Sequence, residues 1–154
     1  IAVILAIFGV GNLEAHSGKT TAVMSELADY HAVLLTNPDA AIDTSRLVVL
    51  LEAGGDSAKI TAIFASAVAP ARNLGQATTS TARLAAYAAL VDGLREVVGH
   101  HDESGARVFY CPMAKKYWIA RGETVQNPYL SNMRSCGTVK QSFAGSRAGD
   151  GDKP

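Results

Sequence analysis

Apolar side chains recur at steps of three and four residues through four successive stretches of the chain, which is the period of an α-helix with one buried face. The first stretch repeats at Val23, Leu27, Tyr30 and Leu34. The last stretch is the longest and alternates these steps like the seam of a helical bundle, at Leu84, Tyr87, Val91, Leu94 and Val98. We therefore expect helices over about 20–36, 38–53, 57–70 and 78–98.

Capping residues and helix breakers separate these stretches. Asn37-Pro38-Asp39 predicts a helix that starts at Pro38, since proline suits the first helical position and aspartate favours the positive end of the helix dipole. Asp56 or Ser57 should cap the third helix, and the Thr78-Thr79-Ser80 cluster should cap the fourth. Pro70 should stop the third helix or kink it near its end.

Four helices with short loops predict an all-α fold, an antiparallel four-helix bundle followed by an irregular C-terminal segment that holds both cysteines. The composition agrees, because the chain is 48% hydrophobic but only 6% aromatic, and its many alanines favour helices. Residues 107–111 are β-branched and aromatic and should form a short extended piece. We place the helical domain at 17–140, its sulfur-rich segment at 107–137, and a disordered tail at 141–154.

The first ten residues are uninterrupted apolar. Ten residues are too few to span a bilayer, which needs about 20, so we expect no stable membrane span in the mature chain. The length fits the hydrophobic region of a secretory signal. We interpret residues 1–16 as a truncated signal-like segment of a periplasmic or otherwise exported protein, with a short anchor and a buried core element as the alternatives.

Charge and motifs argue against several classes of function. The chain has 14 Lys and Arg against 14 Asp and Glu, without a basic run, so we do not expect nucleic-acid binding. Gly18-Lys19-Thr20-Thr21 looks like the end of a phosphate-binding loop, but Leu13 stands where that motif requires its first glycine. No nucleophile motif surrounds either cysteine and no carboxylates are paired for hydrolysis, so we expect no enzyme activity.

Both cysteines and two of the three methionines fall near the C-terminus. Cys111 and Met113 are two residues apart, so in extended backbone their side chains share a face. Met133 and Cys136 are three apart, which gives a shared face on a helical turn. Thiolate and thioether sulfurs select soft metal ions, so we predict a site for Cu(I) or Ag(I) with these four residues as ligands.

Zn(II) is the alternative metal. It would require His100 or His101 in place of the thioethers, because zinc sites in proteins use thiolate, imidazole and carboxylate ligands. The two histidines follow the longest predicted helix. Their simpler role is to interact, as imidazolium, with the negative end of that helix.

The sulfur-rich segment also resembles a bacterial domain family. Its motifs are Cys111-Pro112-Met113, Trp118, Asn127-Pro128-Tyr129 and Met133-Arg134-Ser135-Cys136-Gly137. They are similar to those of an uncharacterised helical domain that occurs as an exported protein, or fused to the periplasmic adaptor (membrane-fusion) subunit of copper/silver efflux systems. The resemblance covers about residues 22–140, and its specific part is 110–137. It implies an extracytoplasmic protein that handles heavy metals, chiefly copper, with an efflux adaptor or another envelope protein as partner.

A disulfide bond is the competing interpretation of Cys111 and Cys136, since two cysteines of an exported protein usually pair. A bridge does not explain the accompanying methionines, because any apolar residue could replace methionine as core filler. The sequence leaves two hypotheses open. One is an accessory protein that binds Cu(I) or Ag(I) in efflux or resistance, and the other is a disulfide-locked envelope protein-interaction module without metal.

Overall fold

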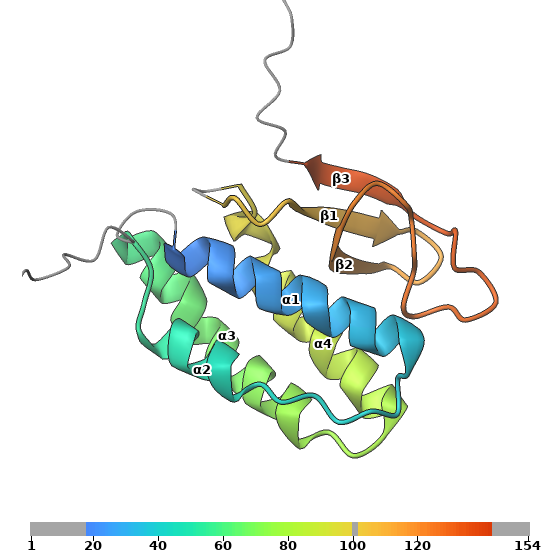
Figure 1. Ribbon diagram of the computed structural model, residues 1–154, viewed down its shortest axis with the longest axis horizontal. Helices are drawn as coiled ribbons and strands as arrows, with labels where there is room; N and C mark the ends of the chain where they lie inside the picture. Colours follow the sequence, from blue (N-terminus) through green and yellow to red (C-terminus); the bar gives the residue numbers. More distant parts are fainter. Residues whose placement is uncertain (1–17, 100–101, 143–154) are drawn as a thin grey trace, which may run out of the picture.

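The computed structural model describes residues 18–99 and 102–142, which form four α-helices, one short 3₁₀-helix and three strands. The helices are α1 (Gly18–Thr36), α2 (Ser45–Glu52), α3 (Ala58–Gln76), α4 (Ser80–Leu94) and the 3₁₀-helix η1 (Arg95–Val97). The strands are β1 (Ala106–Cys111), β2 (Lys116–Arg121) and β3 (Thr138–Ser142), in an antiparallel sheet of order β2-β1-β3 (Figure 1). The fold is therefore α+β, and the predicted all-α four-helix bundle is wrong.

The C-terminal segment forms a sheet because its aromatic and β-branched residues pair across strands. Phe109 lies opposite Trp118, and Tyr110 lies opposite Tyr117, in the register of β1 and β2. Such cross-strand pairs stabilise antiparallel sheets. The extended piece predicted at 107–111 is confirmed as β1. The predicted irregular segment is wrong because residues 116–121 and 138–142 pair with the two edges of that strand.

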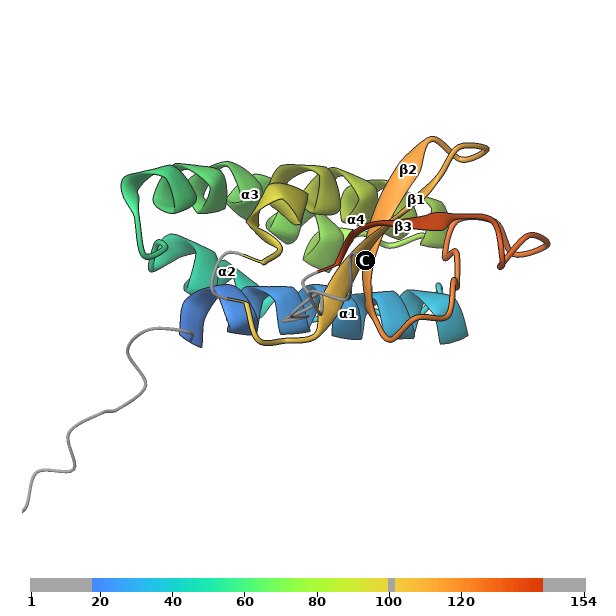
Figure 2. The same cartoon turned by 90° about the horizontal axis from the view of Figure 1, so that it is seen from above.

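The sheet packs on two of the four helices. Strand β2 contacts α1 and α4, whereas α2 and α3 pack on the helical layer and lie farther from the sheet (Figures 1 and 2). The core between these elements consists of fully buried apolar side chains from both layers, including Leu27, Leu34, Leu90, Leu94 and Ile119. The helices therefore serve as the platform on which the sulfur-bearing sheet is held.

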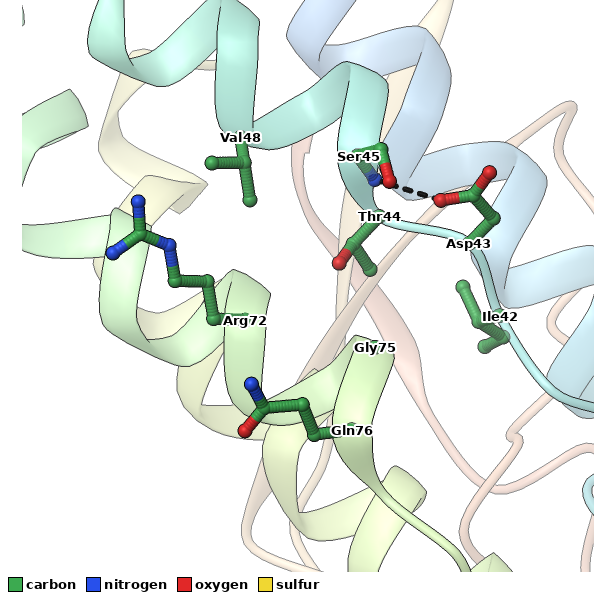
Figure 3. Close-up of a pocket in the computed structure, with 8 residues that line it drawn as sticks. All are labelled: Ile42, Asp43, Thr44, Ser45, Val48, Arg72, Gly75 and Gln76. Carbon is green, nitrogen blue, oxygen red and sulfur yellow. Dashed lines mark hydrogen bonds between the residues drawn. The ribbon is translucent and has the colours of Figure 1, made fainter.

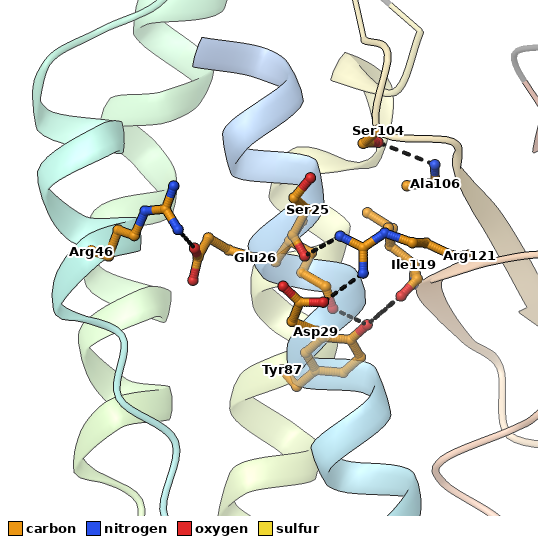
Figure 4. A network of polar contacts seen from close by, with 10 residues as sticks. Ser25, Glu26, Asp29, Arg46, Tyr87, Ser104, Ala106, Ile119 and Arg121 are labelled. Carbon is orange, nitrogen blue, oxygen red and sulfur yellow. Dashed lines mark hydrogen bonds and ion pairs between the residues drawn. The ribbon is translucent and has the colours of Figure 1, made fainter. Parts of the chain in front are cut away.

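One buried polar contact joins α1, α4 and β2. The Tyr87 hydroxyl lies 3.2 Å from the carbonyl oxygen of Leu27 and 3.0 Å from that of Ile119, and it accepts the Ile119 N–H at 3.2 Å. Figure 4 shows this hydroxyl between α1 and the strand. Nearby, Arg121 forms an ion pair with Asp29 of α1. These contacts set the position of β2 over the helices.

Some of the helix boundaries predicted from the sequence are confirmed, and others are wrong. Ser57 and Thr79 are the N-caps of α3 and α4, each accepting a backbone N–H three residues further on, as predicted. Pro70 does not stop α3, which continues to Gln76. The buried stripe of α3 extends to both sides of the proline, so its burial outweighs the hydrogen bond that proline cannot make. That stripe consists of Ile60, Phe64, Ala67, Ala71 and Leu74.

The second helix is shorter than predicted, because it begins at Ser45 and not at Pro38. Side chains provide local turns in residues 37–44 in place of helical hydrogen bonds. The Asn37 side-chain oxygen accepts the Asp39 N–H at 3.2 Å, and the Asp43 carboxylate accepts the Ser45 N–H at 2.9 Å. Asparagine and aspartate compete with the helix in this way.

Candidate functional site at the disulfide

The sulfur residues gather at one end of the sheet. Cys111 is the last residue of β1, and Cys136 lies two residues before β3 begins. The structure joins them by a disulfide bond across a sequence separation of 25. The pairing follows from the topology, because Tyr110 lies opposite Thr138 in the antiparallel β1–β3 pair, which places the end of β1 beside the start of β3.

The loop between β2 and β3 is organised by the buried Asn127. Its backbone N–H donates to the Arg134 carbonyl at 2.7 Å, and its side-chain amide donates to the Cys136 carbonyl at 3.0 Å. Its side-chain oxygen accepts the Tyr129 N–H at 2.8 Å, which forms a local turn at Asn127-Pro128. The Arg134 guanidinium in turn donates to the Asn127 carbonyl at 2.8 Å. One amide side chain therefore fixes the position of Cys136.

Trp118 and Gly137 let the loop approach the sheet closely. Trp118 is fully buried and stacks on Phe109 with ring centroids 5.4 Å apart. Gly137 has φ +148°, and a Cβ there would collide with the Trp118 ring and press on the Tyr110 carbonyl. Only glycine tolerates both the backbone angle and the contact.

The two cysteines differ in exposure. Cys111 is fully buried, and its sulfur accepts the Ala114 N–H at 3.4 Å. Cys136 is half-buried. In this disulfide state neither sulfur is a thiolate, so the pair does not offer the ligands predicted for a metal ion.

The methionines lie in the turns beside the disulfide. Met113 belongs to the β1–β2 turn at 112–115 and is 69% exposed, while Met133 is 41% exposed in the loop before β3. The predicted shared face of Cys111 and Met113 is wrong, because the strand ends at Cys111 and the chain turns. Lys115, with φ +53°, completes that turn. Both thioethers are therefore accessible to solvent next to the bonded cysteines.

His31 contacts the loop of the candidate site, although no sequence motif singles it out. It is buried, and its Nε2 lies 2.7 Å from the Gln126 carbonyl oxygen in the loop that carries Asn127. The spacing of His31 indicates that it is buried, since it lies four residues after Leu27 and seven after Met24, on the buried face of α1. It ties this loop to the helical layer.

Burial lowers the pKa of His31 below its ordinary value, more than the Gln126 hydrogen bond raises it. The unfolded chain therefore binds a proton that the folded protein resists, and the histidine's contribution to stability falls as pH drops below about 6.5. We expect the free energy of unfolding to decrease between pH 7.5 and pH 5 more in the wild type than in His31→Gln. Equal decreases in urea titrations at the two pH values would contradict this.

A shallow cavity lies elsewhere, between the start of α2 and the end of α3 (Figure 3). Its polar lining includes Asp43, Arg72 and Gln76. The Arg72 guanidinium forms an ion pair with Glu52, and the Asp43 carboxylate accepts the Ser45 N–H. It brings none of the predicted site residues together.

Metal ligands of the usual kinds are not clustered in the part of the chain that the structure describes. Across residues 18–99 and 102–142, no three histidine, cysteine, aspartate or glutamate side chains are grouped so that they could hold an ion. His100 and His101, like residues 1–16 and the tail from 143, lie outside the described residues. Among the helices described, none combines the length and hydropathy that crossing a membrane requires. Comparisons with protein-family models, curated proteins and solved structures found no match for this chain.

Proposed function

We propose that this protein is an exported, non-enzymatic accessory protein that binds a soft metal ion, Cu(I) or Ag(I), once Cys111–Cys136 is reduced. The metal would be handed to an envelope partner such as an efflux adaptor, as the resemblance of residues 110–137 implies. A disulfide persists in oxidising compartments, which supports the periplasm or the exterior as the location.

The observation that carries this proposal is the placement of four sulfur-bearing residues at one end of the sheet. Cys111 and Cys136 are bonded to each other, so their reduction would create two adjacent thiols. Met113 is two residues from one of them, and Met133 is three from the other, with the Cys136 N–H donating to the Met133 carbonyl at 3.0 Å. Two thiolates with one or two thioethers form a ligand set that Cu(I) and Ag(I) accept.

The same donor set argues against a hard or borderline metal. Zinc takes thiolate, imidazole or carboxylate ligands and does not favour thioethers. Among the described residues no third ligand of those kinds accompanies the two cysteines, so a zinc site would need His100 or His101, which lie outside them. The exposure of both methionines also suits a metal that is passed on, because neutral thioethers bind weakly and solvent-accessible ligands can exchange with those of a partner.

Titration with Cu(I) tests the proposal. The reduced full-length protein, freed of reductant under anaerobic conditions, should remove one equivalent of Cu(I) from a chromogenic Cu(I) chelator, and the oxidised protein should not. Cys111→Ala and Cys136→Ala should each abolish the uptake. Met113→Leu and Met133→Leu should each weaken it by about ten-fold, or about 1.4 kcal/mol, because each removes a sulfur ligand without removing apolar volume.

Met24→Leu is the matched control. Met24 is fully buried in α1, away from the sheet's sulfur end, so its replacement should leave Cu(I) uptake unchanged. Failure of the reduced wild type to compete for Cu(I) would refute the proposal. Equal losses in Met24→Leu and Met113→Leu would remove the methionines from the ligand set.

The second candidate function is a disulfide-locked interaction module without metal. Specific observations favour it, since the cysteines are bonded and both methionines face solvent and do not enclose the sulfurs. Exposed methionine is typical of adaptable binding surfaces. This candidate predicts no Cu(I) uptake in either redox state, so the titration that tests the first function also decides between the two.

A further inference from the structure

The disulfide is asymmetric in its access to reagents. Cys111 has no exposed surface at the end of β1, and it is bonded to Cys136 in the loop that the buried Asn127 organises. Cys136 is half-buried in that loop. Thiol–disulfide exchange requires a thiolate to reach one sulfur of the bond, and access decides which sulfur is attacked. A reagent approaching the folded protein therefore meets Cys136 first.

The surroundings of Cys111 favour its sulfur as the one that leaves when the disulfide breaks. The Cys111 sulfur accepts the Ala114 N–H at 3.4 Å, within the turn at 112–115. A backbone N–H directed at this atom stabilises the negative charge that it acquires when the bond breaks. No rearrangement of the turn is needed for this, because the hydrogen bond exists while the disulfide is intact.

The charge of the surrounding segment favours the attacking group. Basic side chains lie next to both cysteines. Lys115 is in the turn that follows Cys111, Lys116 lies opposite Cys111 in the β1–β2 register, and Arg134 is two residues before Cys136. An attacking thiolate is an anion, and a positive region raises its local concentration.

We infer that Cys136 is the site at which an external thiol modifies this protein, with Cys111 as the leaving sulfur. A thiolate forms a bond to the Cys136 sulfur, the Cys111–Cys136 bond breaks, and its electron pair leaves on Cys111, which takes a proton from water. A second thiolate then attacks the external sulfur of the mixed disulfide. It releases Cys136 as a thiol and leaves the reagent oxidised to its own disulfide. The reagent class is a thiol reductant, and this step would open the proposed metal site.

Peptide mapping of the wild type tests which of the two sulfurs the external thiol attacks. The oxidised protein is treated briefly with glutathione, quenched with acid, alkylated with N-ethylmaleimide and digested with trypsin. Cleavage after Arg107, Lys115, Arg134 and Lys140 separates Cys111 in peptide 108–115 from Cys136 in peptide 135–140. Glutathione should be found on 135–140, and maleimide on 108–115, in about ten-fold excess over the reverse. An equal or reversed distribution would overturn the inference.

Single-cysteine variants give an independent measurement. In Cys111→Ala the remaining Cys136 should react with an aromatic disulfide reagent about ten-fold faster than Cys111 does in Cys136→Ala, and the two rates should converge in denaturant. Equal rates in variants that keep the native circular dichroism would overturn the inference. If either variant unfolds, the mapping of the wild type decides alone. Neither experiment contains metal, so the inference can stand if Cu(I) binding fails, and can fail if Cu(I) binds.

Discussion

Replacing both cysteines, as Cys111→Ala with Cys136→Ala, should lower the free energy of unfolding by about 3.5 kcal/mol. The bridge spans a sequence separation of 25, and by the loop-entropy relation a crosslink of that length removes this much freedom from the unfolded chain. Alanine is the appropriate replacement because Cys111 is fully buried, and a serine hydroxyl there would add the cost of an unpaired polar group.

Urea denaturation of the oxidised wild type, the reduced wild type and the double variant measures this loss. The reduced protein should resemble the variant, because both lack the crosslink. Amide hydrogen exchange should locate the weakening in β3 and the loop of Asn127, while α3 and α4 keep their protection, since the bridge joins the end of β1 to that loop and includes no residue of either helix. A loss below about 1 kcal/mol would mean that the loop's own hydrogen bonds hold it in place without the bridge.

The helices could be predicted from the sequence because their information is local. The steps of three and four that include Leu27 and Val91 recur on the buried faces of α1 and α4. Ser57 and Thr79 act through hydrogen bonds that span only three residues. The predicted start of α2 at Pro38 was wrong because a second local interaction competes with the helix. The side chains of Asn37 and Asp43 accept nearby backbone N–H groups and form turns there.

The sheet could not be predicted because its pairing is not local. Strand β1 was visible from its composition, but its turn to β2 contains no glycine, and Lys115 adopts a positive φ that no turn rule assigns to lysine. Strand β3 is polar apart from Val139, and its partner Phe109 is 30 residues away. Polar edge strands carry little periodicity, so the pairing depends on contacts that only the folded chain provides.

Some features of the candidate site could likewise be predicted from the sequence, and others could not. Both open interpretations of the sequence, a shared metal site and a disulfide, place Cys111 and Cys136 together, and the β1–β3 register brings them together as a disulfide. The orientation of Met113 was not predictable from its spacing, because the face-sharing rule holds only while the strand continues. His31 could have been found, since its position on the α1 stripe is as regular as that of Leu27.

Tyr87→Phe should cost about 2 kcal/mol of stability although it removes only one oxygen atom. The Tyr87 hydroxyl is the acceptor for the Ile119 N–H and lies within hydrogen-bond distance of the carbonyls of Ile119 and Leu27. All of these groups are buried, so no water replaces the oxygen. Burial also raises the pKa of Tyr87 above its ordinary value, which favours the protonated hydroxyl as a donor.

Tyr129→Phe is the matched control, because the Tyr129 hydroxyl donates to a single carbonyl, that of Tyr117, at 2.6 Å in a half-buried position. Its loss should cost less than about 1 kcal/mol, since no donor is left unpaired. Comparable losses in the two variants would mean that β2 is held over α1 and α4 by apolar packing alone. A larger loss in Tyr87→Phe, with faster exchange of the Ile119 amide, would identify this hydroxyl as the link through which the helical layer positions the strands that carry the sulfur site.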